Sequence, residues 1–184
     1  MVEVNPVQLY NNVVEEQLCL KLIKIVNLLA TKKLGLGQKD FKNKKQRNVY
    51  GYSLNLQNEN DLKIVNLISA QIYQCLLDYK KKFAELVLND VSQVDLLKYK
   101  KGGHYVKHID QDHAMNRILS FIINLNEGYE GGEVCFYNPQ TSKPLQPIPL
   151  EVGDILFFPS NFLYPHAILP IKYRTRFSIV GWLN

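Results

Sequence analysis

The first half of the chain carries apolar residues at helical spacing. From Val13 to Leu34, and again from about Asp61 to Leu88, apolar positions recur close to every 3.6 residues, so both stretches are predicted to be amphipathic helices. Looser alternation over residues 48–56 predicts a strand between them. The expected caps and stops are Asn11 or Asn12, Gly35 and Gly37 for the first helix, and Asn60 for the second.

The second half has a different pattern, in which short apolar runs are separated by Gly and Pro. The runs are Val91–Lys98, Tyr105–His108, Ile118–Asn126, Glu133–Tyr137, Ile155–Phe158, His166–Leu169 and Phe177–Leu183. Many short strands with such turns predict a sandwich or barrel. We therefore expect a mainly β fold, a double-stranded β-helix (jelly roll) braced on one face by two N-terminal helices.

Length and composition favour a single domain over residues 1–184. The chain has 184 residues, 46% of them hydrophobic and 21% charged, which is ordinary for a globular domain. We expect residues 1–90 to give the helical support and a basic loop, and residues 91–184 to give the jelly-roll core. Three widely spaced cysteines exclude a zinc knuckle and argue against a secreted disulfide framework. Because the sequence shows neither a membrane span nor a signal-peptide pattern, we expect a cytoplasmic or otherwise intracellular protein with no membrane partner.

The positive charge is concentrated before residue 108. Residues 1–107 contain 17 Lys/Arg and 10 Asp/Glu (+7), whereas residues 108–184 contain 5 and 7 (−2). The densest basic patch is Lys39–Arg47, which is either a solvated loop or a rim that attracts an acidic or nucleic-acid partner.

Three residues of the second half have the spacing of metal ligands. His108 and Asp110 are two apart, so on a strand their side chains point to the same side. His166 lies on a later predicted strand, and jelly-roll strands return beside earlier ones. Two histidines and one carboxylate on one face of a metal leave positions open, a ligand set suited to Fe(II) and O2 chemistry.

A carboxylate clamp follows near the end of the chain. Arg176 and Ser178 share one face of a predicted strand, and a guanidinium fork matches the two oxygens of a carboxylate. A metal and a carboxylate clamp inside one β-barrel suggest a dicarboxylate that also chelates iron. 2-Oxoglutarate has this chemistry, with an oxo-acid end for the metal and a distal carboxylate for Arg176.

From about Leu96 to Leu183 the sequence resembles the Fe(II)/2-oxoglutarate-dependent dioxygenases, and more narrowly the prolyl 4-hydroxylases with their lysyl-hydroxylase relatives. The resemblance rests on the order and spacing of several segments. They are residues 99–110 (YKKGGHYVKHID), 117–126 (RILSFIINLN), 131–133 (GGE), 153–158 (GDILFF), 166–170 (HAILP) and 176–182 (RFSIVGW).

The resemblance implies roles for individual residues. His108, Asp110 and His166 would bind Fe(II), and O2 and 2-oxoglutarate would be co-substrates, with ascorbate as a further candidate cofactor. Arg176 would pair with the distal carboxylate of 2-oxoglutarate, with Ser178 beside it. Further roles fall to Tyr99, which would hydrogen-bond 2-oxoglutarate, and to Tyr105 and Trp182, which would line the pocket for the oxidised residue.

The implied activity is hydroxylation of a prolyl residue in a protein or peptide. The alternatives are a lysyl or other amino-acid hydroxylase, a nucleic-acid demethylase of the same superfamily, and a non-enzymatic metal-binding jelly-roll module. Asn124 stands where many prolyl hydroxylases have Tyr, and with Tyr129–Gly132 it is closer to the lysyl-hydroxylase pattern. His104, Asp112 and His113 are expected outside the ligand set, and residues 35–48 are the expected lid.

Overall fold

The protein is represented by a computed structural model that describes residues 5–35, 45–111 and 116–184. Two helices, α1 (Glu16–Leu29) and α2 (Glu59–Lys82), precede most of the strands. The strands are β1 (Gln8–Tyr10), β2 (Lys32–Lys33), β3 (Arg47–Asn48), β4 (Tyr50–Ser53), β5 (Val91–Tyr99), β6 (His104–His108), β7 (Leu119–Asn124), β8 (Val134–Phe136), β9 (Ile155–Pro159), β10 (His166–Ile168) and β11 (Arg176–Leu183).

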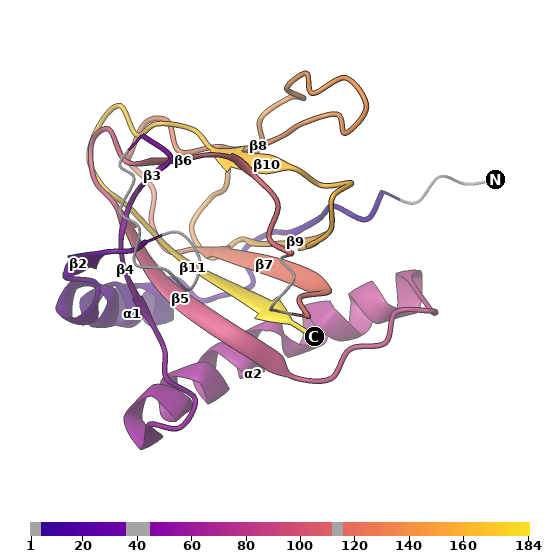
Figure 1. The fold of residues 1–184 in the computed structure, drawn as a ribbon. Helices are drawn as coiled ribbons and strands as arrows, with labels where there is room; N and C mark the ends of the chain where they lie inside the picture. Colours follow the sequence, from indigo (N-terminus) through magenta and orange to yellow (C-terminus); the bar gives the residue numbers. More distant parts are fainter. Residues whose placement is uncertain (1–4, 36–44, 112–115) are drawn as a thin grey trace.

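These strands form two antiparallel sheets that face each other (Figure 1). The major sheet has the order β1-β9-β7-β11-β5-β4-β2, and the minor sheet has the order β3-β6-β10-β8. Neighbours in each sheet are far apart in sequence, as the pairing of β11 with both β5 and β7 shows. The two-sheet arrangement confirms the predicted jelly roll with N-terminal helices.

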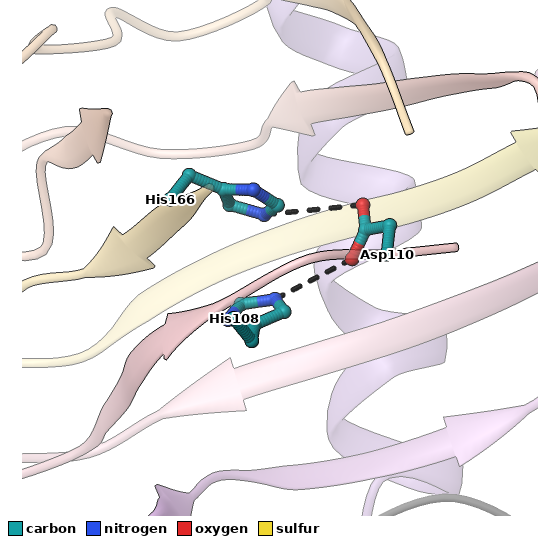
Figure 2. A group of neighbouring side chains, drawn as sticks. All are labelled: His108, Asp110 and His166. Atoms are coloured by element: carbon teal, nitrogen blue, oxygen red, sulfur yellow. Dashed lines mark ion pairs between the residues drawn. The ribbon is translucent and has the colours of Figure 1, made fainter. Parts of the chain in front are cut away.

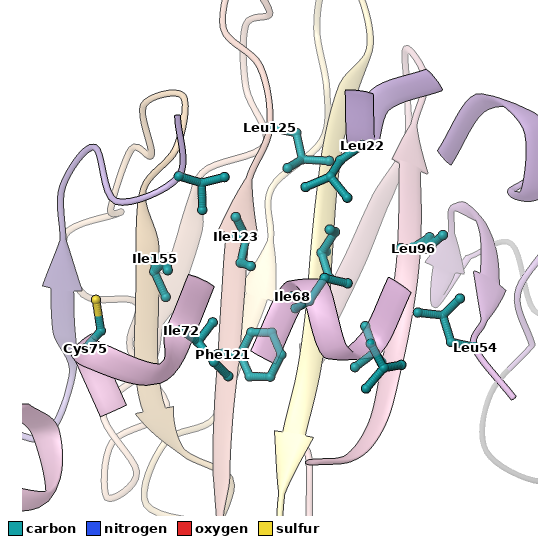
Figure 3. Packing of buried hydrophobic residues seen from close by; sticks show 14 of the residues in the cluster. Leu22, Leu54, Ile68, Ile72, Cys75, Leu96, Phe121, Ile123, Leu125 and Ile155 are labelled. Atoms are coloured by element: carbon teal, nitrogen blue, oxygen red, sulfur yellow. The ribbon is translucent and has the colours of Figure 1, made fainter. Parts of the chain in front are cut away.

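Both helices lie on the outer face of the major sheet (Figure 1). Figure 3 shows Ile68 and Ile72 of α2 packed over Phe121 and Ile123 of β7, and Leu22 of α1 belongs to the same cluster. Burial of such side chains supplies about 1.5–3 kcal/mol each, which makes this layer a main source of stability. Within the described residues, neither helix is long and apolar enough to cross a membrane.

Strand alternation separates this helix-facing core from a second core between the sheets. Along β11, Ile179 and Leu183 face the helices, whereas Val180 and Trp182 face the minor sheet. Because both faces of the major sheet are covered, β7 is buried along its whole length. The polar residues at inward positions of these strands therefore lie inside the jelly roll, where burial without a partner is costly.

The structure corrects the predicted helix ends. The first helix ends at Leu29 rather than Leu34, and neither Asn11 nor Asn12 caps it. Both asparagines instead bond to the carboxylate of Asp154, through the Nδ2 of Asn11 (3.2 Å) and the backbone N–H of Asn12 (3.0 Å). The cap of α2 is Asn58, not Asn60, because its side chain accepts from the backbone N–H groups of residues 60 and 61. This helix begins at Glu59 and ends at Lys82, six residues before the predicted end.

The predicted strand over residues 48–56 is two strands in different sheets. β3 pairs with β6 in the minor sheet, whereas β4 pairs with β5 in the major sheet. Val49, which lies between them, is fully buried in the inter-sheet core. The chain therefore crosses from one sheet to the other at this residue, a step that a loose alternation pattern cannot indicate.

The turn before β8 gives a stability prediction. Gly131 has a φ of 79°, and a Cβ there would lie 2.1 Å from the carbonyl oxygen of Pro170. We expect Gly131→Ala to destabilise the protein by at least about 2 kcal/mol, because the backbone strain adds to a clash with another backbone segment. Gly102→Ala is the matched control, since its φ is 75° but a Cβ there would have no neighbour within 4 Å. Equal losses of unfolding free energy in the two variants, measured in urea, would contradict the clash.

Candidate active site

Three side chains meet where the minor sheet ends. His108 closes β6, Asp110 follows two residues later, and His166 opens β10, directly opposite His108 in the antiparallel register. The Nε2 atom of His108 lies 3.4 Å from one oxygen of Asp110, and that of His166 lies 3.8 Å from the other. One ligand atom from each residue falls within 4.8 Å of the other two, and Figure 2 shows the side chains converging.

Both imidazoles are held in the orientation that a metal requires. The Nδ1 of His108 lies 2.8 Å from the carbonyl oxygen of Val106, and the Nδ1 of His166 lies 3.2 Å from that of Tyr164. A carbonyl oxygen only accepts, so Nδ1 carries a proton in each ring, which leaves Nε2 as the atom that faces Asp110 and can bind a metal. This tautomer suits a metal ligand.

The carboxylate of Asp110 is also fixed from behind. The hydroxyl of Ser120 donates to its Oδ2 at 2.7 Å, and the hydroxyl of Ser160 lies 2.8 Å from that of Ser120. Because the Ser120 proton is used toward Asp110, Ser160 must donate to Ser120. Both serines are buried, and the pair leaves Oδ1 as the freer oxygen for a cation.

The protonation states favour a cation as well. Burial alone would raise the pKa of Asp110, but His166 and His108 together with the Ser120 hydrogen bond hold it well below its usual range. Burial, with a smaller contribution from His108, lowers the pKa of His166 to about 4. Near neutral pH an ionised carboxylate and a neutral imidazole therefore face the same point, a donor set that fits a divalent metal.

A buried guanidinium stands at the start of β11. Arg176 is 1% exposed, its Nε donates to the Oδ1 of Asn124 at 3.1 Å, and its buried Nη2 has no hydrogen-bond partner in the part of the chain that the structure describes. No carboxylate in residues 5–35, 45–111 or 116–184 forms an ion pair with it. An unpaired buried charge is strongly unfavourable, so this donor fits an anionic group from outside the chain.

All eight residues singled out from the sequence line one cavity between the sheets. Its empty volume, open mouth included, is about 390 Å³. The eight are Tyr99, Tyr105, His108, Asp110, His166, Arg176, Ser178 and Trp182. Burial raises the pKa of Tyr99, so its hydroxyl stays protonated and can donate to a ligand. The ring of Tyr105 stacks on that of His108 with a centroid distance of 3.6 Å.

Other sequence candidates lie elsewhere. The ring nitrogens of His104 lie 3.0 and 3.2 Å from the carbonyl oxygens of Gly102 and Lys45, not at the cavity. Asp112 and His113 lie outside the described residues, as do residues 36–44 of the expected lid. Arg47, predicted as part of the basic surface patch, instead lines the cavity with a side chain only 12% exposed.

Sequence reasoning missed several polar residues around the site. Asn124, noted only as a departure from a pattern, accepts hydrogen bonds from Arg176 and from the hydroxyl of Tyr129 through one oxygen. Its Nδ2 donates to three backbone carbonyls, which fixes the amide orientation. The signal for Asn124 and Ser120 was present in the sequence: both are polar residues inside an otherwise apolar strand.

The second half of the chain matches a known family. Residues 94–184 match the 2OG-Fe(II) oxygenase superfamily. A PKHD-type hydroxylase of Prochlorococcus marinus (strain NATL2A) is 37% identical over 87 residues, which cover 45% of this chain and 37% of that protein. The hypoxia-inducible factor prolyl hydroxylase of Caenorhabditis elegans is 29% identical over 127 residues, which cover 66% and 17%. The chain thus spans little more than a third of the first relative.

Solved structures share the fold over nearly the whole chain. A prolyl hydroxylase from Trichoplax adhaerens, in complex with a hypoxia inducible factor oxygen degradation domain peptide fragment, superimposes with a TM-score of 0.80 at 17% identity, covering 98% of this chain and 84% of that chain. A Pseudomonas putida prolyl-4-hydroxylase gives 0.74 at 19% identity, covering 98% and 93%. Helices and sheets alike therefore follow an established architecture.

Proposed function

We propose, from the premise that residues 94–184 belong to the 2OG-Fe(II) oxygenase superfamily, that this chain is an Fe(II)- and 2-oxoglutarate-dependent hydroxylase. The observation that carries the proposal is the pairing of two features in one cavity. A convergent His-Asp-His set lies at one position, and a buried guanidinium with an unpartnered Nη2 lies at another. A dicarboxylate that also chelates a metal satisfies both.

Each residue then has a distinct task. His108, Asp110 and His166 would hold Fe(II) on one face, through two Nε2 atoms and one carboxylate oxygen. Arg176 would receive the distal carboxylate of 2-oxoglutarate, with Ser178 beside it on the same strand face. When bound, Fe(II), 2-oxoglutarate and O2 would supply the oxidant that converts a substrate C–H into C–OH, with release of succinate and CO2.

The remaining wall residues would keep the reaction confined. The hydroxyl of Tyr99 would donate to 2-oxoglutarate, because its raised pKa keeps it protonated. Tyr105 and Trp182 would form apolar walls that exclude water and hold the substrate carbon near the metal. Ascorbate would serve to restore Fe(II) after turnover without substrate.

We propose a prolyl residue of a protein or peptide as the substrate. Support comes from the relatives, since both the nematode protein and the Trichoplax and Pseudomonas structures are named prolyl hydroxylases. The sequence argument for lysine rested on Asn124 and on Tyr129–Gly132. In the structure the Oδ1 of Asn124 accepts from Arg176 and from Tyr129, so Asn124 supports the proposed anion site.

A mass-spectrometric assay tests the proposal. The protein is incubated with Fe(II), 2-oxoglutarate and O2 over peptides rich in proline and, separately, in lysine, and succinate is measured in parallel. We expect a gain of one oxygen on proline only when 2-oxoglutarate is present. Oxidised lysine would support the hydroxylase activity but would contradict proline as the substrate. Absence of succinate under every condition would contradict the proposal that this chain is a 2-oxoglutarate-dependent enzyme.

A further inference from the structure

A chain of contacts leaves the metal site at His108 and runs along the inner face of the jelly roll. Tyr105 stacks on His108 with an interplanar angle of 16°, and the guanidinium carbon of Arg47 lies 4.7 Å from the centre of the Tyr105 ring. The Nη2 of Arg47 lies 3.8 Å from the Oδ2 of Asp95, which is 2% exposed. This arm therefore connects a metal ligand to a buried carboxylate through stacked planar groups.

A second series of hydrogen bonds, the second arm, connects the carboxylate of Asp95 to Asp110, the candidate ligand that neighbours His108. The Nε2 of Gln93 donates to Asp95 at 2.8 Å, and the Oε1 of Gln93 accepts from the Nη2 of Arg117 at 2.7 Å. The Nη1 of Arg117 donates to the backbone oxygen of Asp110 at 3.0 Å. The guanidinium carbon of Arg117 also lies 3.8 Å from the ring centre of Trp182, which lines the cavity.

We propose that these five residues act as one positioning unit, which we name the inner bridge: Tyr105, Arg47, Asp95, Gln93 and Arg117. The inner bridge begins on His108 and ends on Asp110, so it fixes the spacing of the two neighbouring ligands before a metal binds. Such an arrangement lowers the ordering cost of metal binding, as supporting hydrogen bonds do around other metal sites. The inference rests on the proposed metal site, but it concerns contacts within the chain.

The charges and contacts of the inner bridge indicate that its five residues position His108 and Asp110 together rather than separately. Asp95 is the only member with a negative charge, and both arms meet on its carboxylate. Arg47 is tied at its other side as well, because its Nη1 donates to the carbonyl oxygen of Gly35 at 3.1 Å. When two groups of one hydrogen-bonded network are substituted together, the free-energy losses do not add. The losses at two separate sites do add. Non-additivity is therefore the signature of a single unit.

The test uses Co(II) alone as the metal probe, with its visible absorption as the readout. We expect Arg47→Gln and Arg117→Gln each to weaken Co(II) binding about 10- to 100-fold, as loss of residues that support metal ligands does. In the double variant, we expect the loss of Co(II) affinity to be at most about twice the larger of the two single losses. Independent effects would instead give the product of the two losses. Arg47→Lys should retain the charge but recover only part of the affinity, because an ammonium does not stack flat on Tyr105. Lys101→Gln, a change at an exposed lysine, is the matched control.

A second readout does not require a metal. Trp182 is the only tryptophan of the chain, so its fluorescence reports directly on the wall beside Arg117. We expect Arg47→Gln to shift this emission although, among the described residues, the cation–π contact of Arg47 is with Tyr105 and that of Trp182 is with Arg117. Asp95→Asn, which keeps an acceptor for Gln93 and removes the charge facing Arg47, should give the same shift if Arg47→Gln fails to fold.

The outcomes separate the inner bridge from the proposed function. Unchanged Trp182 emission in both Arg47→Gln and Asp95→Asn, or Co(II) losses that multiply in the double variant, would overturn the inner bridge. Wild-type protein that fails to bind Co(II) would instead overturn the metal site, while the emission of the metal-free variants would still decide the inner bridge.

Discussion

Replacing His166 with alanine is expected to abolish succinate formation and to weaken metal binding by more than about 100-fold. Loss of residues that merely support a metal ligand costs 10- to 100-fold, so loss of a ligand should cost more. His166 contributes one of the three converging ligand atoms, and its lowered pKa keeps that atom free of a proton near neutral pH. Titration with Co(II) and a succinate assay on the same sample measure both effects.

His104→Ala is the matched control for this prediction. His104 lies at the start of the strand that ends in His108, but its ring nitrogens lie against two backbone carbonyls. We expect wild-type metal affinity in this variant. Both proteins should melt within a few degrees of wild type, since neither change touches the helix-facing core. Undiminished succinate formation by His166→Ala would remove this histidine from the ligand set.

Arg176→Met is expected to weaken 2-oxoglutarate binding about 30- to 4,000-fold. Truncating one partner of a buried charged pair costs about 2–5 kcal/mol, and each factor of ten in a dissociation constant is 1.4 kcal/mol. The side chain is 1% exposed and its Nη2 has no hydrogen-bond partner among the described residues, so this donor is available to the distal carboxylate. Calorimetric titration of the Co(II) protein with 2-oxoglutarate gives the dissociation constant.

Two further variants sharpen the result. Arg176→Lys keeps the charge but loses the fork, so an intermediate affinity is expected. Arg174→Met removes an exposed arginine two residues earlier and should leave the affinity unchanged. Metal binding without 2-oxoglutarate should stay at the wild-type level in all three variants. An Arg176→Met protein that binds 2-oxoglutarate normally would place the distal carboxylate elsewhere.

The candidate metal and anion residues could be proposed from the sequence because their signals are local. His108 ends β6 and Asp110 follows two residues later, and Arg176 and Ser178 repeat the same spacing within β11. His166 could be predicted because a jelly roll brings later strands beside earlier ones. In the structure, His166 lies directly opposite His108 in the antiparallel pairing. Strand periodicity also accounts for the two cores seen in the structure, since alternate side chains of one strand face opposite sides.

The features that escaped prediction depend on tertiary contacts. Arg47 belongs to a run of basic residues that favours a solvated loop, yet the crossing of the chain at Val49 turns it into the cavity. Asn11 and Asn12 have the chemistry of helix caps, but Asp154, more than 140 positions away, uses them instead. A side chain that serves a distant segment leaves no periodic signal in its own neighbourhood.

The alternation along β11 has a consequence for how this protein can change over generations. Arg176, Ser178 and Trp182 face the cavity, whereas Ile179 and Leu183 face the helices. Alternate positions of this strand are therefore selected for different properties, namely the chemistry of the cavity and the packing of the helix-facing core. A one-residue deletion would exchange the two sets and disable chemistry and folding together. Insertions and deletions should therefore be excluded from this strand during evolution. A mutant library that diversifies only its inward positions would explore new substrates while keeping the scaffold.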